Sequence, residues 1–187
     1  MNDATVDAGS DKPSLKGFTR KGVEGANVYG VKFTQTFPGI PLEKAWANAM
    51  NFTQRSSYDT RFVEPTFFEE NDSYVYYYAK LPKPPTAIIS QREFLVEGHK
   101  IPNGGGEGKH IFVALNRVHP DKPIGTGFFS TIRAYLNYHG MVFEAIDPSN
   151  PDAGTKLTEC RAWDMNGNIP AMAMNSVMPK MCTTPFE

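Results

Sequence analysis

Cysteine is scarce in this sequence, and no stretch is long and apolar enough to cross a bilayer as a helix. Among its 187 residues are two cysteines, Cys160 and Cys182, and no Cys-x-x-Cys pair. We therefore expect free thiols, and neither a disulfide framework nor a zinc site made of cysteines. The longest uncharged stretch, residues 165–179, is interrupted by asparagine and proline and is shorter than the about 20 residues that a transmembrane helix needs.

Charge of either sign is also sparse. Lys and Arg total 19 and Asp and Glu total 20, for a formal net charge of -1, and Lys and Arg form no cluster. Because a protein that binds nucleic acid needs a basic surplus or a basic stripe to neutralise phosphates, we exclude this class. Aromatic residues, in contrast, make up 12% of the chain, which is typical of a folded globular protein.

The motifs of catalysis and metal binding are missing as well. No His-Glu-x-x-His, His-x-His or Gly-x-Ser-x-Gly occurs, and the glycines at 104–106 are not followed by a lysine and a hydroxyl residue. The four histidines fall in separate predicted strands or strand ends: His99, His110, His119 and His139. We therefore predict no catalytic residue, no metal site and no cofactor.

The start of the chain differs in composition from the rest. Residues 1–14 are mostly small, polar or acidic, and they have neither the basic region nor the apolar region of a secretory signal. We expect residues 1–14 to be a disordered tail, residues 15–187 to form one domain, and the protein to be cytoplasmic.

One segment has the periodicity of a helix, and several have that of strands. An apolar stripe at helical spacing predicts a helix at Leu42, Ala45, Trp46, Ala49 and Met50. Alternation predicts strands at residues 26–37, 62–69, 74–81, 92–100, 109–118, 129–137, 139–147 and 155–164. Their connections are rich in turn residues, which indicates an antiparallel meander.

A last helix is predicted over residues 169–181, where methionines recur at helical spacing. A curved sheet of this size can bury its concave face against one short helix only by wrapping around it. The space left between sheet and helix is a natural ligand cavity. The predicted fold is therefore α+β, a long curved antiparallel sheet around a C-terminal helix, with an internal hydrophobic cavity.

Alternation along each strand divides the side chains into two faces, and we predict that one face lines the cavity. The expected lining residues are Tyr76, Tyr78, Phe94, Val96, Met141, Phe143, Cys160, Ala162 and, on the last helix, Met174 and Met178. On the strand 155–164 the smaller side chains are expected inside, because Glu159 and Arg161 leave less room. For the tyrosines, simple packing of the sheet is an equally good explanation. Arg92 either lines the cavity or anchors the sheet through a carboxylate.

The order of these features resembles that of a START (StAR-related lipid-transfer) domain, a family of the helix-grip, Bet v 1-like superfamily. The resemblance runs from about Gly30 to Met181. It rests on short motifs in matching order: Val31-Lys32-Phe33, the helix with Trp46, Tyr58-Asp59-Thr60-Arg61, Tyr74 to Tyr78, Arg92-Glu93-Phe94, Gly140 to Ile146, and Trp163 to Pro170 followed by Asn175. Each motif is weak alone, but together their order and spacing are specific.

The resemblance implies a hydrophobic tunnel that holds one lipid, closed by the last helix and nearby loops, with Asn175 among the lipid contacts. Such a protein carries lipid between membranes, or senses it, without catalysis. We expect transient contact with a membrane surface, no nucleic-acid partner and a monomer. The ligand stays open among sterol, phospholipid, ceramide and fatty acid, since each of them needs an apolar tunnel.

Three departures from the family pattern stand out. Many members place an acidic residue and an arginine inside the cavity, and here those positions are Tyr78 and Gly98. Losing both charges together avoids a buried unpaired charge, so recognition of a polar headgroup falls to tyrosines or other polar groups. The family's N-terminal helix has no counterpart before residue 14. Pro179 and the chain end at Glu187 predict a short last helix, either an abbreviated lid or a truncated chain.

Two other functions remain open. An enzyme on the same scaffold, of hydrolase or cyclase type, needs an acid–base pair inside the cavity. Glu144 and Asp164 are available as a general base, but nothing in the sequence distinguishes either of them. A protein-interaction module, in contrast, would have a cavity packed shut by its tyrosines and methionines.

Overall fold

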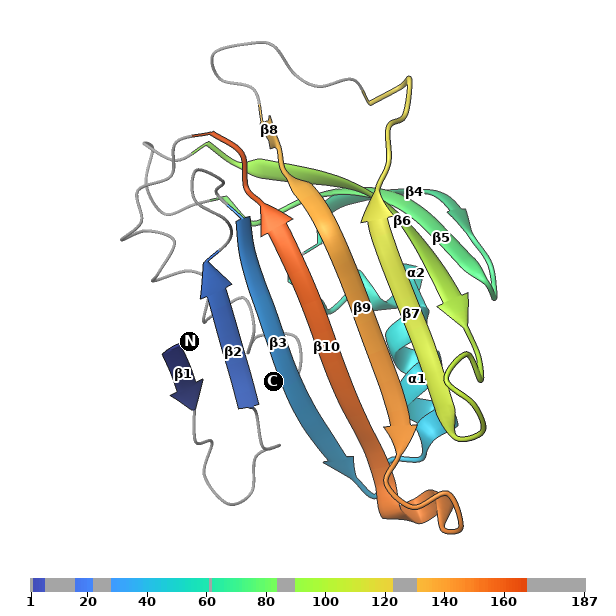
Figure 1. The fold of residues 1–187 in the computed structure, drawn as a ribbon. Helices are drawn as coiled ribbons and strands as arrows, with labels where there is room; N and C mark the ends of the chain where they lie inside the picture. The colour runs from blue at the N-terminus through green and yellow to red at the C-terminus, as the bar shows by residue number, and fades with distance from the viewer. Residues whose placement is uncertain are drawn as a thin grey trace.

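The computed structural model describes residues 2–5, 16–21, 28–60, 62–83, 90–122 and 131–167. In these residues, one large curved sheet carries two short α-helices on one of its faces (Figure 1). The strands are β1 (Asn2–Thr5), β2 (Lys16–Lys21), β3 (Val28–Pro38), β4 (Val63–Glu70), β5 (Tyr74–Lys80), β6 (Arg92–Ile101), β7 (Lys109–Asn116), β8 (Ile132–Arg133), β9 (Tyr135–Ala145) and β10 (Gly154–Asp164). The helices are α1 (Leu42–Met50) and α2 (Phe52–Arg55), and a 3₁₀ turn at Pro151–Ala153 precedes β10.

The strand order across the sheet is β1-β2-β3-β10-β9-β7-β6-β5-β4, with β8 beside β6. All neighbours are antiparallel except β6 and β8. The predicted meander is therefore confirmed from β4 to β10. β3 pairs along its whole length with β10, so a strand from the early part of the chain lies beside the last strand described.

One part of the predicted meander is wrong. Two strands were predicted over 129–137 and 139–147, but in the described part of these segments β9 is a single strand of eleven residues across the predicted break, and β8 has only two. Tyr138, where the break was predicted, pairs with Ala162 of β10, so the ladder continues across that position. The pairing of β9 with β10 is instead interrupted by a β-bulge next to this pair, and the bulge lets the strand bend without a turn.

The first predicted helix is confirmed as α1. Pro41 precedes its first turn, a position where the missing N–H costs nothing. The residues Leu42, Trp46 and Met50 are buried along one side. Trp46 packs edge-on against Phe143 of β9, with ring centroids 5.6 Å apart. The apolar stripe of α1 therefore faces the concave side of the sheet.

The concave face of the sheet and the two helices share one hydrophobic core. The sheet contributes Phe33, Val75, Phe94, Val96, Phe112, Met141, Phe143 and Leu157 to it. Burial of one such side chain contributes about 1.5–3 kcal/mol. Because the large apolar side chains gather on this face, the interior of the fold lies between the sheet and the helices.

Two predicted segments lie wholly or partly outside the described residues. The helix expected over 169–181 is one of them, so Met174, Asn175 and Met178 are not placed. Within the segment 1–14, for which we expect a tail, Asn2–Thr5 form β1 and pair with β2 at the edge of the sheet.

Candidate functional site

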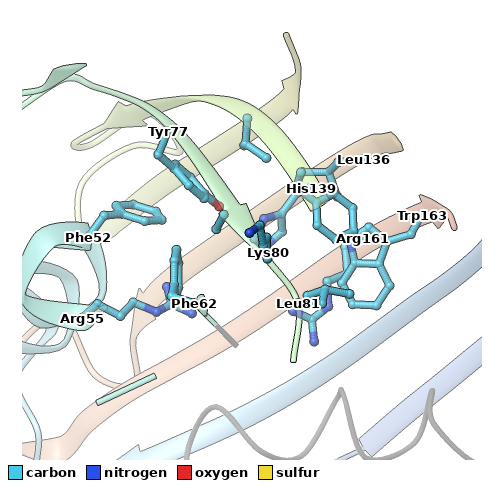
Figure 2. A pocket seen from close by; sticks show the side chains of 13 residues that line it. Phe52, Arg55, Phe62, Tyr77, Lys80, Leu81, Leu136, His139, Arg161 and Trp163 are labelled. Carbon is cyan, nitrogen blue, oxygen red and sulfur yellow. The ribbon is translucent and has the colours of Figure 1, made fainter. Parts of the chain in front are cut away.

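A pocket lies between α2 and the concave surface of β5, β6, β9 and β10 (Figure 2). We call it the sheet pocket, and it has a volume of about 90 Å³. Most of its lining is aromatic or aliphatic: Phe52, Phe62, Tyr77, Ala79, Leu81, Phe94, Val96, Leu136 and Trp163. The others are basic, namely Arg55, Lys80, His139 and Arg161, and none of the described residues that line it is acidic.

A second pocket, the helix pocket, lies between α1 and the ends of β3 and β9. Its volume is about 220 Å³. Its lining residues are Phe37, Ile40, Ala45, Asn48, Ala49, Arg55, Tyr58 and Phe143. Because Arg55 lines both pockets, its side chain forms part of the wall between them.

Buried contacts hold Arg55 at this boundary. Its Nε donates a hydrogen bond of 3.0 Å to Oδ2 of Asp59, and the two side chains are 10% and 3% exposed. The guanidinium also lies 5.7 Å from the ring centroid of Phe52 and 5.9 Å from that of Phe62. A cation in such surroundings is stabilised by its carboxylate and by the aromatic faces, since little water reaches it.

A buried cluster of His139, Glu159 and Arg161 forms the opposite side of the sheet pocket. Oε1 of Glu159 lies 2.9 Å from Nε2 of His139 and 2.9 Å from Nη1 of Arg161. The guanidinium of Arg161 lies 4.5 Å from the ring centroid of Trp163 and 5.6 Å from that of Phe33. Only 4% of the Arg161 side chain and 2% of the Glu159 side chain are exposed. The two opposite charges therefore compensate each other out of contact with water.

The pKa of His139 is lowered from its ordinary value of 6.5. Burial is the largest cause, and the positive charges of Arg161 and Arg55 act in the same direction, whereas Glu159 raises it. The imidazole is therefore neutral at pH 7. Both arginines act on this imidazole, although Arg55 comes from α2 and Arg161 from β10.

No protein-family model and no curated protein sequence matches this chain. Solved structures do match it. Human STARD10 has a TM-score of 0.73 at 16% identity, over 99% of this chain and 71% of its own. Human StAR-related lipid transfer protein 5 has a TM-score of 0.71 at 19% identity, over 95% of this chain and 79% of its own. A STAR-related lipid transfer protein from Xanthomonas axonopodis has a TM-score of 0.60 at 18% identity, over 94% of this chain and 93% of its own. The fold is that of a START domain.

In the START fold of this chain the buried charge pair lies on β10. The two positions where the sequence comparison expected charges, Tyr78 and Gly98, carry none. A Cβ atom at Gly98 would lie 2.5 Å from Cζ of Phe112, so that position has no room for a side chain. Glu159 and Arg161 supply the interior charges instead, which corrects the expectation of a cavity without a charge pair.

The predicted face of β10 is reversed. Glu159 and Arg161 face the interior, while Cys160 and Ala162, predicted to line the cavity, line neither pocket. The hydroxyl of Thr158, on the same face as Cys160, lies 3.4 Å from that of Thr34 on β3. The prediction chose the face by side-chain size, but the two charges are tolerated inside because they pair with each other.

The predicted face of β5 is also reversed. Tyr77 lines the sheet pocket and packs against Phe52 and Phe62, with centroid distances of 5.6 and 5.4 Å. Tyr76 and Tyr78 lie on the convex side and line neither pocket. The Tyr76 hydroxyl donates a hydrogen bond of 2.9 Å to the backbone carbonyl of Val118. The Tyr78 hydroxyl donates one of 2.8 Å to Oε2 of Glu93. Their polar ends therefore have partners on the convex face.

Arg92 is a structural residue and lines neither pocket. Its Nε donates to the carbonyl of Met165 at 3.0 Å, and its Nη2 donates to the carbonyl of Asn166 at 2.9 Å. The anchoring role considered from the sequence is thus present, but the acceptors are backbone carbonyls rather than a carboxylate. These bonds tie the chain after β10 to the start of β6.

The remaining predicted residues of the described chain lie on the concave face. Phe94 and Val96 line the sheet pocket, and Phe143 lines the helix pocket. Met141 is 1% exposed and belongs to the core between them without lining either pocket. The sequence reasoning missed Arg55, His139 and Arg161. A signal was available for Arg161, because it shares one face of a predicted strand with Glu159.

The described residues contain no group of three or more His, Cys, Asp or Glu side chains placed to hold a metal ion. None of the helices described has the length and apolar character needed to span a membrane. The site that the described residues form is mainly apolar, with basic groups on two sides of its wall.

Proposed function

We propose that this chain binds a single lipid between the sheet and the helices, and carries or senses it without changing it chemically. The observation that carries the proposal is the lining of the sheet pocket, which is mainly aromatic and aliphatic and has its polar groups on two sides. Removing apolar surface from water contributes roughly 25 cal/mol per Å², so such a wall favours a hydrocarbon chain. The START fold, shared with proteins named for lipid transfer, supports the same function.

A lipid needs more space than either pocket offers alone, since ligand pockets usually measure about 300–1,000 Å³. The two pockets meet at Arg55, on the short helix α2. We infer that the boundary at α2 widens on loading, so that the two spaces join beside Arg55. Part of what holds α2 in place is one carboxylate, Glu70 of β4, which accepts hydrogen bonds from the N–H groups of Phe52 and Thr53.

The proposal is tested by purifying the chain from cells, recording native mass spectra and extracting the lipid. We expect a lipid bound in stoichiometric amount and released on denaturation. A chain that carries no lipid, and takes up none from mixed vesicles, would contradict the proposal.

A pair of matched variants tests the location. Val96→Trp places a large ring in the sheet pocket and should abolish loading. Val113→Trp is the control, because Val113 is 39% exposed on the neighbouring strand β7 and lines neither pocket. Equal loading in both variants would show that the lipid binds elsewhere.

A hydrolase-type enzyme is the second candidate, because a histidine and a carboxylate lie together at the pocket. Glu159 orients His139 as a carboxylate orients a general base. However, Glu159 also pairs with Arg161, and the described lining includes no Ser, Thr or Cys as a nucleophile. The chain should therefore leave lipid esters intact. Release of fatty acid from a bound ester, lost in His139→Gln, would favour the enzyme instead.

The bases considered from the sequence do not serve that reaction. Glu144 lies 2.7 Å from Nζ of Lys109 and 3.2 Å from Nζ of Lys156, and lines neither pocket. Asp164 accepts a hydrogen bond from the N–H of Asn166 in the turn after β10. Both carboxylates have structural partners at the surface.

A further inference from the structure

The charged residues that line the sheet pocket are all basic. Arg55, Lys80 and Arg161 line the pocket, whereas their carboxylate partners, Asp59, Glu64 and Glu159, do not. For Arg55 and Arg161, the basic residue and not its carboxylate partner therefore belongs to the pocket wall, whereas Lys80 shares the face of β5 that carries Tyr78. Although these two pairs are neutral as a whole, a cleft lined by charges of one sign focuses a potential of that sign inside it.

The two arginines of the interior are also fixed in orientation. Arg161 lies over the ring of Trp163, and Arg55 lies near the rings of Phe52 and Phe62. These aromatic residues are themselves part of the pocket wall. Each guanidinium is therefore held between an aromatic surface and a carboxylate, and loses little freedom when it binds a further group.

We propose that the sheet pocket receives the headgroup of the lipid, and that this headgroup is an anionic oxyacid, a carboxylate or a phosphate, bound between Arg55 and Arg161. This inference rests on the proposed lipid-binding function and narrows its ligand class. Guanidinium groups bind carboxylate and phosphate through paired hydrogen bonds. A neutral lipid offers these guanidinium groups no charged acceptor beyond the carboxylates that they already contact.

Glu159 does not prevent this arrangement. Its Oε1 atom is engaged by both His139 and Arg161, and its side chain is 2% exposed. His139, with its neutral imidazole, lines the pocket, and so does Arg161, whereas Glu159 does not. The side chains that an anion contacts in this part of the wall are therefore cationic or neutral.

The test compares lipids that share one hydrocarbon chain. Oleic acid, oleoyl-lysophosphatidate and oleyl alcohol are delivered separately from cyclodextrin at mildly alkaline pH, and the protein-bound lipid is quantified after gel filtration. We expect at least one of the two anionic lipids to bind about tenfold or more tightly than the alcohol, as for hydrogen bonds to a charged group. The oleic acid and lysophosphatidate arms distinguish a carboxylate from a phosphate ligand.

Two outcomes separate this inference from the proposed function. If oleyl alcohol binds as tightly as both anionic lipids, the inference is wrong and lipid binding stands. If none of the three binds, and the chain takes up no lipid from vesicles, the proposed function fails as well.

Charge-balanced variants locate the headgroup. In Arg55→Met/Asp59→Asn and Glu159→Gln/Arg161→Met, each cation is removed together with its carboxylate partner. Both should weaken binding of the preferred anionic lipid about tenfold more than binding of the alcohol. The control, Lys109→Met/Glu144→Gln, removes a surface pair of the same type. Unchanged anionic binding in both pocket variants would overturn the assignment, as would equal weakening for the alcohol.

Discussion

The ring of Phe112 on β7 occupies the space in which a side chain at Gly98 on β6 would begin. A Cβ atom at Gly98 would lie 2.5 and 2.6 Å from two ring carbons of Phe112 and 3.0 Å from Val75. The ring has little room to move, because it is 1% exposed and packs against Phe52 and His139. The concave face is therefore closed at this point by one aromatic ring, and the charged groups of the interior lie on other strands.

Gly98→Ala should destabilise the fold by about 1–3 kcal/mol, as overpacking of a filled core does. Gly140→Ala on β9 is the matched control, because a Cβ atom there has no neighbour within 4 Å. Urea unfolding of both variants measures the difference. Equal stability of the two would show that Phe112 yields freely. Phe112→Leu should restore part of the loss in Gly98→Ala.

Arg161→Met alone should destabilise the protein by about 3–5 kcal/mol, because it leaves the buried carboxylate of Glu159 without its cation. The double variant Glu159→Gln/Arg161→Met should recover most of this loss, since no unpaired charge remains. The measurement is the free energy of unfolding in urea for the single and the double variant. A double variant as unstable as Arg161→Met would mean that packing on Trp163, rather than charge, stabilises the arginine.

Tyr78→Phe should cost about 1–2 kcal/mol of stability, because the buried hydroxyl donates to a carboxylate, Glu93. Tyr76→Phe should cost less than about 0.5 kcal/mol, because its hydroxyl bond is exposed. Thermal unfolding compares the two. Since both tyrosines lie on the convex face, neither change should affect lipid loading. A loss of loading in either variant would place that tyrosine in the site after all.

Lowering the pH should loosen α2 through Glu70. Although burial raises the pKa of Glu70, hydrogen bonds from the side chain of Thr53, from the N–H groups of Phe52 and Thr53 and from Lys100 lower it below its ordinary value of 4.5. The carboxylate therefore contributes stability above its pKa in the unfolded chain. This contribution is lost as the pH falls through the lower pKa of the folded state.

Glu70→Gln tests this dependence. The variant should be less stable than the parent protein at pH 7, and the difference should shrink in acid, as measured by unfolding at a series of pH values. Glu144→Gln is a control with its partners on the surface: its pKa is lowered first by the hydrogen bond from Lys109, but it does not hold α2. A pH-independent difference between Glu70→Gln and the parent would contradict the assignment.

The sequence by itself determined the elements and much of the topology. The stripe of Leu42, Trp46 and Met50 predicted α1, and period-two alternation predicted most of the strands and their meander. Ordered short motifs also pointed to the START fold, although identity to the matching structures is only 16–19%. These features are local or depend on the order of motifs along the chain, so they can be predicted without the tertiary structure.

Only the tertiary structure decided which face of each strand is inside. Alternation defines two faces with equal regularity, and neither Tyr76 and Tyr78 on β5 nor Cys160 on β10 carries a local sign of its orientation. The choice depends on partners distant in sequence: Phe52 and Phe62 for Tyr77, and His139 for Glu159. A charged face became the interior of β10 because its carboxylate and guanidinium compensate each other there, and the contact of Glu159 with His139 is added when β9 and β10 pair.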